Sequence, residues 1–499
     1  MLADLLNRSF FAVAVPASLT LCALFLLLRA RLFLIFSPRV IRFSLFGQEE
    51  GGGTSPLSAL FSALSGTLGV GNLSGVALAL SSGGAGAGFW MWVSALFASV
   101  LKYAEITLAV AFRRFEGGKP HGGAPLYLSA AFPGCPGRAL SLLFTFFCAG
   151  GALFLGSGVQ SLAVAETMEA TFSFPPLLSG LLFSLFTLLA LSENAKKLSA
   201  VTGRLVPFLT FLYLGVTLWI LLSRASLLPA LLARILREAF SFRAAAGGSG
   251  GFFLSRAVRW GFVRGLVSNE AGCGTAPFAH AAANQKLPAA QGIWGIAEVM
   301  IDTPLFCTLT ALTLLLAFDG AVPDGAGMGL VFLAFHRTIG GLSRPFLAAA
   351  VFLFAYGTTL CQAYYGCEAL LLIGAGQKAR KAFLFLFLLF SLAAPLLPAS
   401  FLWEHADLFC SAALCLNTSA LFSLADKTGE LTRELLAAVS AGRSERKKAR
   451  RTPRDVFRGG GPSSRSPSGR SRKKASLPPR AERTPSRKNP DPPTRGRIA

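Results

Sequence analysis

Long apolar runs recur along most of the 499-residue chain and leave few folds open to it. A helix needs about 20 mostly apolar residues to cross a bilayer, and a chain inside hydrocarbon must satisfy its backbone hydrogen bonds internally. We therefore expect an all-α polytopic membrane protein, and the composition agrees, with 53% hydrophobic and only 14% charged residues. The expected spans are the eleven runs 10–36, 57–82, 86–112, 139–165, 177–192, 200–223, 252–280, 291–318, 346–374, 382–398 and 403–424.

Basic residues between the runs orient the chain. They gather in the connections after the first, third, fifth, ninth and eleventh runs, which the positive-inside rule assigns to the cytoplasm. The sequence thus predicts a multi-pass protein of the cell (cytoplasmic) membrane, with its N-terminus outside and its C-terminus in the cytoplasm. The first run is too long for the apolar core of a signal peptide and contains Arg29 and Arg31, so we expect a retained helix. The connection 224–250 carries four arginines yet falls outside, and we expect an amphipathic surface helix there.

The end of the chain differs in composition from the rest. Residues 442–499 contain 19 Lys or Arg against four acidic residues, so they supply +15 of the net charge of +23. The segment is rich in Arg, Lys, Ser and Pro, which predicts a disordered cytoplasmic extension that contacts anionic lipid rather than a specific nucleic acid. The nine cysteines show no C-x-x-C spacing, so we expect reduced packing residues and no bound cofactor.

Two of the apolar runs are interrupted by glycine and polar residues. The second contains SGTLGVGNLSG, residues 65–75, and the seventh contains SNEAGCGTAPFAHAAA, residues 268–283. Each glycine weakens a helix by about 1 kcal/mol, and unwound backbone at membrane depth is tolerated only inside protein or beside a cavity. In the second stretch we expect Thr275 to cap a new half-helix, with Pro277 in its first turn. Two interrupted helices five spans apart are typical of an inverted-repeat transporter with a site between them at mid-membrane.

The chemistry of such a site suits a zwitterion. Free N–H groups at half-helix N-termini attract a carboxylate, while unwound carbonyls attract a small cation or an ammonium. A phosphate-binding loop is disfavoured for GTLGVGN because no strand precedes it. Close helix packing through small residues is the alternative for the first interruption taken alone.

Three segments carry long motifs: GVGNLSGVALALSSGGAGAGFWMWVSALFASVLKYAEITLAVAFR, HGGAPLYL and GFVRGLVSNEAGCGTAPFAHAAA. Together they resemble the alanine or glycine:cation symporter family, also called sodium:alanine symporters, over about residues 57–425. The resemblance implies a LeuT-type fold of two inverted five-helix repeats after one extra N-terminal helix. The implied division is an extra helix with a cytoplasmic connection (1–56), a first repeat (57–223), an extracellular connection (224–251), a second repeat (252–425) and the basic disordered tail (426–499).

The resemblance also implies which residues bind ligands. Substrate is expected at the two interruptions and the fourth run, at Thr67, Gly69, Val70, Gly71, Asn72, Gln160, Asn269, Cys273, Gly274 and Thr275. Sodium is expected between the first interruption and the ninth run, at Gly66, Gly69, Thr358 and Thr359, where hydroxyl and carbonyl oxygens suit a small cation. The chain departs from the family pattern at Gly357 and Gln362, where a hydroxyl and a tryptophan are common. A helix cap for Asn72 and an interhelical hydrogen-bond partner for Gln160 are the alternative roles.

Charged residues inside the runs are candidates for coupling, because a charge in lipid is costly. Glu270 and Asp302 are the expected coupling residues. Lys102 and Glu105, three residues apart on one helix, are expected to form a structural ion pair. We expect His280 to be a buried polar partner rather than a proton carrier.

The resulting hypothesis is a symporter that couples inward sodium flow to the uptake of alanine, glycine or a similar small neutral amino acid by alternating access. The alternatives are a proton-coupled amino-acid transporter and a non-transporting membrane sensor of amino acids. An enzyme is not expected, because the apolar body lacks paired catalytic carboxylates, zinc-ligand spacing or a nucleophile with its base.

Overall fold

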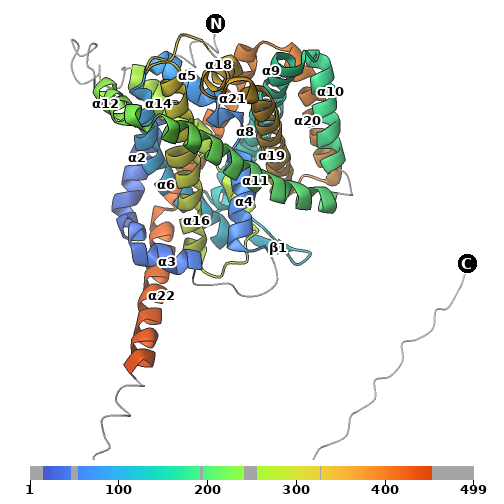
Figure 1. Ribbon diagram of the computed structural model, residues 1–499. Coiled ribbons are helices and arrows are strands. Elements are labelled where there is room, and N and C mark those ends of the chain that lie inside the picture. The colour runs from blue at the N-terminus through green and yellow to red at the C-terminus, as the bar shows by residue number, and fades with distance from the viewer. Residues whose placement is uncertain (1–14, 47–53, 192–194, 241–255, 326, 452–499) are drawn as a thin grey trace, which may run out of the picture. The chain divides into compact units, whose positions relative to one another are not determined.

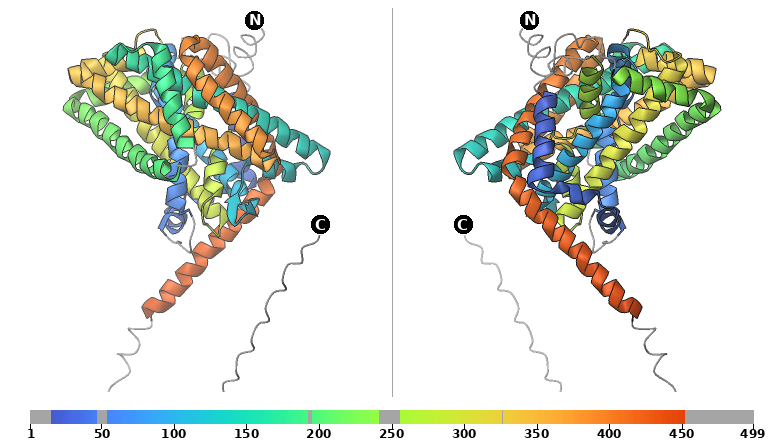
Figure 2. Two further views of the ribbon diagram at one scale, coloured as in Figure 1. Left: turned by 90° about the vertical axis from the view of Figure 1, so that its right-hand side faces the viewer. Right: turned by 90° about the vertical axis from the view of Figure 1, so that its left-hand side faces the viewer.

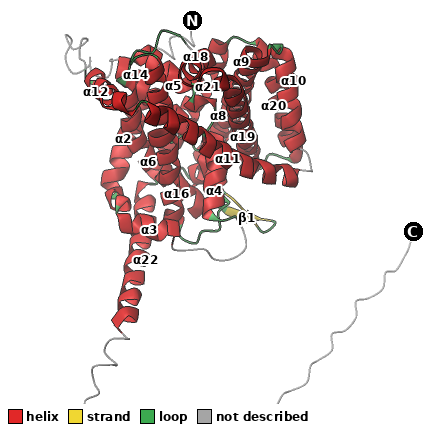
Figure 3. Cartoon of the chain, viewed as in Figure 1, coloured by secondary structure: helices red, strands yellow, loops and turns green. Residues whose placement is uncertain are grey.

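The computed structural model describes residues 15–46, 54–191, 195–240, 256–325 and 327–451 (Figure 1). Helices make up almost all of the described secondary structure (Figure 3), and one short antiparallel hairpin pairs β1 (Arg114–Glu116) with β2 (Lys119–His121). The chain divides into two units, residues 1–443 and 444–499. The site lies in the first unit.

The helices of the first part of the chain overlap the first six expected runs, and further helices lie between the runs. They are α2 (Val15–Arg29), η2 (Leu32–Phe36), α3 (Pro38–Phe46), α4 (Pro56–Thr67), η3 (Val70–Asn72), α5 (Ser74–Gly83), α6 (Ala87–Ala111), α7 (Ala124–Ala131), α8 (Cys135–Gly151), η4 (Ala152–Val159), α9 (Gln160–Phe172), α10 (Pro176–Leu191), α11 (Ala195–Ser223), η5 (Ala225–Leu227) and α12 (Leu228–Ala239).

The helices of the second part are α14 (Arg256–Asn269), α15 (Ala276–Ala281), α16 (Pro288–Met300), η7 (Ile301–Cys307), α17 (Thr308–Ala317), α18 (Met328–Ile339), η8 (Gly340–Leu342), α19 (Ser343–Leu372), α20 (Gln377–Ala393), η9 (Ala394–Leu396), α21 (Ala399–Ser423) and α22 (Ala425–Arg451). Each of the eleven expected runs overlaps at least one of these helices. Within the described ranges, six helices are long and apolar enough to cross a membrane by themselves, and up to eight spans result if each of two bent pairs counts as one. The number eleven stays a prediction.

Both predicted interruptions are present in the structure. Helix α4 ends at Thr67, Gly69 adopts an extended backbone, and the axis turns by 67° before η3 and α5 continue. Helix α14 ends at Asn269 and α15 begins at Ala276. Between them Glu270, Gly272 and Gly274 all have positive φ, a conformation that costs glycine little and explains the glycines of this stretch.

Helix α6 lies at the centre of the packing and contacts α14, α15, α16 and α2 (Figure 2). Small residues let these helices approach closely. A methyl group on Gly265 would lie 2.1 Å from Ser94 Oγ on α6, and one on Gly292 would lie 2.4 Å from Thr107 Oγ1. This close packing holds α14 and α16 against α6. Glu270 directly follows the end of α14, and Asp302 lies two residues beyond the end of α16.

The connection after α11 forms the expected amphipathic helix. Helix α12 bends by 74° from the end of α11 and buries Leu231, Ile235 and Ala239 on one face. Its Arg234 donates to Glu238 at 2.7 Å, one turn further along the helix. The arginines of this connection are thus compatible with a helix that lies across the protein rather than through it.

The predicted start of the disordered tail at residue 426 is wrong. Helix α22 continues to Arg451, and its first turns bury Leu431 and Leu435. Thr432 Oγ1 lies 2.9 Å from the Tyr103 hydroxyl of α6, and residues 426–443 belong to the first unit. The apolar positions four residues apart supply a narrow buried stripe that the high average charge of the segment conceals. The remaining part of the predicted tail, 452–499, lies outside the described residues.

Candidate substrate and cation site

The first interruption places Gly69 directly against two other helices. A methyl group on Gly69 would lie 2.6 Å from Thr358 Oγ1 of α19 and 3.2 Å from Gln160 Oε1 of α9. The backbone N–H of Val70 donates to Gln160 Oε1 at 3.3 Å, and Gln160 Nε2 donates to the Leu155 carbonyl at 3.2 Å. Gln160 is therefore an interhelical hydrogen-bond partner that satisfies the backbone freed by the break.

Replacing Gly69 with alanine is expected to destabilise the protein by about 1–3 kcal/mol, because both contacting atoms belong to buried side chains that must move. Gly71→Ala is the matched control. A methyl group there meets nothing within 4 Å, and neither glycine has positive φ, so alanine is allowed by φ at both positions and lacks space only at Gly69. Thermal unfolding of the detergent-solubilised protein measures both. Equal losses in the two variants would show that the close approach at Gly69 does not matter.

Asp302 joins the two interruptions. Its carboxylate is fully buried in η7, and Oδ1 accepts a hydrogen bond from Asn72 Nδ2 at 2.7 Å. Oδ2 accepts from Ser268 Oγ at 2.9 Å and from Thr303 Oγ1 at 2.8 Å. Asn72 belongs to the first break and Ser268 to the last turn of α14 before the second. All these donors are neutral, so the negative charge of a buried carboxylate is hydrogen-bonded but not paired within this group.

Asn72 also caps the break. Its Oδ1 accepts a hydrogen bond from the Gly69 backbone N–H at 3.2 Å, while its Nδ2 donates to Asp302. One side chain thus holds the unwound backbone and the carboxylate together. The two roles proposed for Asn72, helix cap and ligand-site residue, are compatible in this geometry.

Glu270 occupies the second interruption. Its carboxylate accepts hydrogen bonds of 2.6 Å from Thr275 Oγ1 and from Gln362 Nε2 of α19. Thr275 stands at the N-cap of α15 as predicted, with Pro277 in the first turn, but its hydroxyl makes no capping hydrogen bond. The side-chain part of the capping prediction is wrong: the Thr275 hydroxyl donates to the Glu270 carboxylate and accepts from no backbone N–H of α15.

The next residues of this interruption are held mainly by α6 and α21. The Gly274 N–H donates to Glu105 Oε2 at 3.1 Å. Asn417 Nδ2 donates to Glu105 Oε2 at 2.9 Å and to the Gly272 carbonyl at 2.8 Å. Asn269 faces the Asp302 group, because its Nδ2 donates to Thr303 Oγ1 at 3.2 Å.

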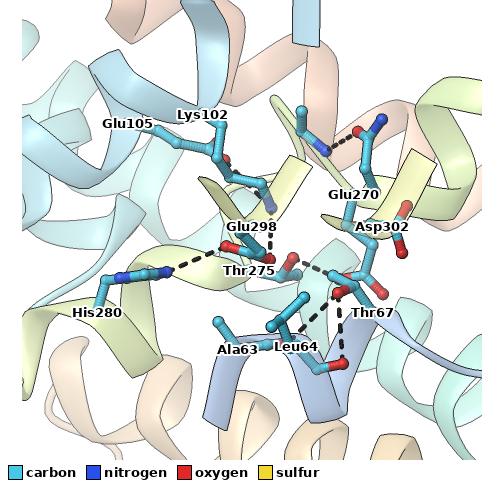
Figure 4. Close-up of polar contacts among 12 residues, drawn as sticks. Ala63, Leu64, Thr67, Lys102, Glu105, Glu270, Thr275, His280, Glu298 and Asp302 are labelled. Carbon is cyan, nitrogen blue, oxygen red and sulfur yellow. Dashed lines mark hydrogen bonds and ion pairs between the residues drawn. The ribbon is translucent and has the colours of Figure 1, made fainter. Parts of the chain in front are cut away.

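A chain of buried charges lies next to Asp302 (Figure 4). Lys102 Nζ lies 3.3 Å from Glu298 Oε1 of α16 and 4.0 Å from Glu105 Oε1, so its closer partner is Glu298 and not the residue on its own helix. Glu298 Oε2 lies 3.0 Å from His280 Nε2, and His280 Nδ1 lies 2.8 Å from Gln291 Nε2. His280 is fully buried among polar partners, as expected. This chain ties α15 to α6 and α16.

The residues expected to bind sodium point in different directions. Thr358 faces the first break, and its Oγ1 donates to the Ser65 carbonyl at 3.3 Å. Thr359, the next residue of α19, instead donates to the Gly156 carbonyl of η4 at 2.8 Å. Gly66 packs against Cys361 and Tyr365, and the Thr67 hydroxyl lies 3.5 Å from carbonyls of its own helix (Figure 4). Of the two hydroxyls, only that of Thr358 adjoins the break.

A cavity of about 490 Å³ reaches this region. Val70, Ser74, Glu270 and Cys273 line its inner end. Residues of α9, α14 and α21 line the outer part, including Glu166, Arg259, Arg264, Trp403, Glu404 and Asp407. Among the expected substrate residues, Val70 and Cys273 face the cavity, whereas Asn72, Gln160 and Gly274 support the surrounding backbone. Among the described residues, no group of three or more His, Cys, Asp or Glu side chains is arranged to hold a metal ion.

The structure adds four residues to those expected from the sequence: Ser268, Thr303, Arg264 and Asp407. Ser268 directly precedes Asn269, and Thr303 directly follows Asp302. Their hydroxyl groups could therefore have been predicted from the sequence as part of the site. Arg264 and Asp407 form an ion pair at 3.1 Å across 143 residues of sequence, and no local pattern predicts such a contact.

The chain is similar to known membrane transporters. The model of the sodium:alanine symporter family matches residues 2–449. The sodium/alanine symporter AgcS of Methanococcus maripaludis is 33% identical over 407 residues, covering 80% of this chain and 87% of that protein. The probable sodium/glutamine symporter GlnT of Bacillus subtilis is 31% identical and covers 74% and 76%. A solved manganese transporter of Eremococcus coleocola is similar at 17% identity and a TM-score of 0.48, covering 76% of this chain and 79% of that one.

These matches concern membrane transporters and not enzymes, which confirms the expectation that the chain is not an enzyme. The match of the family model covers most of the chain, including both interruptions and the helices that surround Asp302. The chain therefore belongs to the sodium:alanine symporter family.

Proposed function

We propose that this protein couples inward sodium movement to the uptake of a small neutral amino acid, alanine or glycine, by alternating access to a site between the two interrupted helices. The buried Asp302 carboxylate carries this proposal. It is held by neutral donors from both interruptions, and a bound cation there would compensate its charge. An ion at this position would stabilise the arrangement of Asn72 and Ser268 around the substrate site, which is the physical basis of coupling.

The substrate would bind beside this carboxylate, at the inner end of the cavity. Val70 lies on the first break and Cys273 on the second, so both interruptions contribute to one wall. Glu270 lies at the same inner end and offers an anionic group to a substrate ammonium. Thr358, next to Gly69, is the hydroxyl best placed to contribute a second sodium ligand. The name of AgcS supports alanine as the substrate, and the name of GlnT makes glutamine the second candidate.

A LeuT-type arrangement is proposed for the whole chain. Residues 57–223 and 252–425 form the two repeats, and each begins with an interrupted helix, α4–η3–α5 in the first and α14–α15 in the second. In this arrangement the eleven runs span the membrane, the C-terminus is cytoplasmic, and the cavity opens to the outside. Ala399 and Ser400 are exposed and line the cavity, and they lie between the tenth and eleventh runs, a connection that this arrangement places outside.

Uptake of labelled alanine into proteoliposomes tests the proposal. An inward sodium gradient should drive accumulation, a potassium gradient should not, and Asn72→Ala should lower the initial rate by about 10-fold or more, because the change removes a hydrogen bond to a buried charge. Accumulation driven by a proton gradient without sodium would show that protons, and not sodium ions, drive the uptake. Alanine binding without uptake under any gradient would favour the sensor.

A further inference from the structure

The motif HGGAPLYL, residues 121–128, has no role in the central site. Its first three residues lead out of the β1–β2 hairpin and lie against α15, the second half of an interrupted helix. A methyl group on Gly123 would lie 2.4 Å from the ring of Phe278, and one on Gly122 would lie 2.7 Å from the Cβ of Ala281. Figure 1 shows β1 at the end of the structure opposite α18. The two glycines thus allow the hairpin to pack directly on α15.

The hairpin and α6 also bind the end of α15. Arg113, which lies between α6 and β1, donates to the carbonyls of Ala283 at 2.6 Å and Gln285 at 2.9 Å. The Asn284 N–H donates to the carbonyl of Thr54, two residues before α4 begins, at 2.8 Å. Carbonyls at the end of a helix have no partner within it, so these contacts satisfy them and fix the position of α15.

His121 joins the hairpin to α19. Its Nδ1 lies 2.8 Å from Glu368 Oε2, and the two side chains are 18% and 7% exposed. One turn earlier on α19, the Tyr364 hydroxyl donates to the carbonyl of Phe278 at 3.4 Å. Helix α19 therefore holds the hairpin and α15 together. A protonated imidazole forms a charge-assisted hydrogen bond with a carboxylate, which is about twice as strong as the bond that a neutral imidazole forms.

The His121 ring is the part of this contact that can respond to pH, because histidine ordinarily changes its charge between about pH 5 and 8. Arginine, lysine, glutamate and tyrosine ordinarily keep their charge in that range. The other charged or titratable groups on the elements around His121 are Arg113, Arg114 opposite it in the ladder, Glu116, Lys119, His280 of α15 and Tyr364. Of these only His280 is a histidine, and its ring is fully buried between Glu298 and Gln291.

We propose that residues 113–123 form a pH-sensitive latch on α15, in which a protonated His121 pairs with Glu368 and holds α15 in the observed position. This proposal rests on the proposed function, in which α15 borders the central site and must move when that site opens to the cytoplasm. The latched position binds the His121 proton more tightly than a released one, so low pH favours it and high pH releases it. The connection that contains the hairpin is one that the positive-inside rule assigns to the cytoplasm, so cytoplasmic acidification should slow uptake.

The initial rate of sodium-driven alanine uptake at different pH values tests the latch. Proteoliposomes with the full-length protein are buffered equally on both sides, and the wild-type rate should fall about 3-fold from pH 8 to about pH 5.5, as expected for a partly exposed ion pair. His121→Gln and Glu368→Gln should keep the fast rate throughout. His121→Lys carries a permanent charge and should keep the slow rate throughout. His336→Gln, at an exposed histidine of α18, is the matched control and should keep the wild-type profile.

Hydrogen exchange of the backbone amides of residues 276–285 tests the latch without transport. In the purified protein at about pH 6, these amides should exchange faster in His121→Gln than in the wild type, and no faster in His121→Lys. Exchange in α6 should be the same in all three proteins, which shows that the variants are folded.

The outcomes separate the latch from the proposed function. Sodium-driven uptake whose pH profile is the same in His121→Gln as in the wild type would overturn the latch and leave the proposed function intact. Equal exchange of residues 276–285 in the wild type and His121→Gln would also overturn the latch. Absence of uptake at every pH would overturn the proposed function, and the exchange measurement would still decide whether His121 holds α15.

Discussion

Asp302→Asn is expected to abolish sodium-driven alanine uptake. The carboxylate is fully buried and is contacted by Asn72, Ser268 and Thr303, and the substitution removes its charge while it keeps nearly the same shape. Asp302 carries the only full negative charge among these four residues, so a sodium ion bound there would lose its charged partner. Loss of one charged interaction of about 3 kcal/mol corresponds to roughly 100-fold in affinity. The measurement is the initial uptake rate as a function of sodium concentration.

The control for Asp302→Asn is a carboxylate on the protein surface. Asp426 pairs with Arg29 at 2.9 Å, but both side chains are more than half exposed, so Asp426→Asn should leave the sodium dependence unchanged. Equal abundance of the variants in the proteoliposomes must be established first. An unchanged sodium dependence in Asp302→Asn would exclude this carboxylate as the coupling group and leave Glu270 as the remaining candidate.

The interruptions could be predicted from the sequence because their signal is local. Gly69 and Gly71, or Gly272 and Gly274, lie within a few residues of polar side chains, and unwound backbone at membrane depth is tolerated only inside protein or beside a cavity. The approximate positions of the apolar helices could also be predicted, because each apolar run is a local feature of the sequence. The positive φ of Gly272 and Gly274 shows that the second cluster is a requirement of the backbone.

The partners within the site could not be predicted in this way. Asn72 and Asp302 are 230 residues apart in sequence, and Gln362 and Glu270 are 92 apart. Which side chains meet depends on how the helices pack around α6, and apolar periodicity specifies only which face is buried. Lys102 illustrates the limit, because Glu105 is its neighbour on one helix while the closer partner is Glu298 on another.

Lys102→Met is expected to destabilise the protein by about 3–5 kcal/mol, because it leaves buried Glu298 and Glu105 without their nearest cation. His280 is the remaining neighbour of Glu298, and the Gly274 N–H and Asn417 still contact Glu105. Thermal unfolding of the solubilised protein should show a midpoint lower by several degrees, about 5 °C or more. Glu298→Gln in the Lys102→Met background should recover part of the loss, since it removes one of the unpaired charges.

Lys427→Met is the matched control for Lys102→Met, and it separates burial from distance. Lys427 pairs with Glu430 at 2.9 Å, closer than the 3.3 Å between Lys102 and Glu298. The side chains of Lys427 and Glu430 are 41% and 53% exposed, however. If distance decided the energy, the surface variant would lose more stability. Solvent screens the exposed pair and hydrates whichever charge is left, so its loss should stay below about 1 kcal/mol. Comparable midpoints for the two variants would mean that the buried charge chain does not hold α15 against α6 and α16.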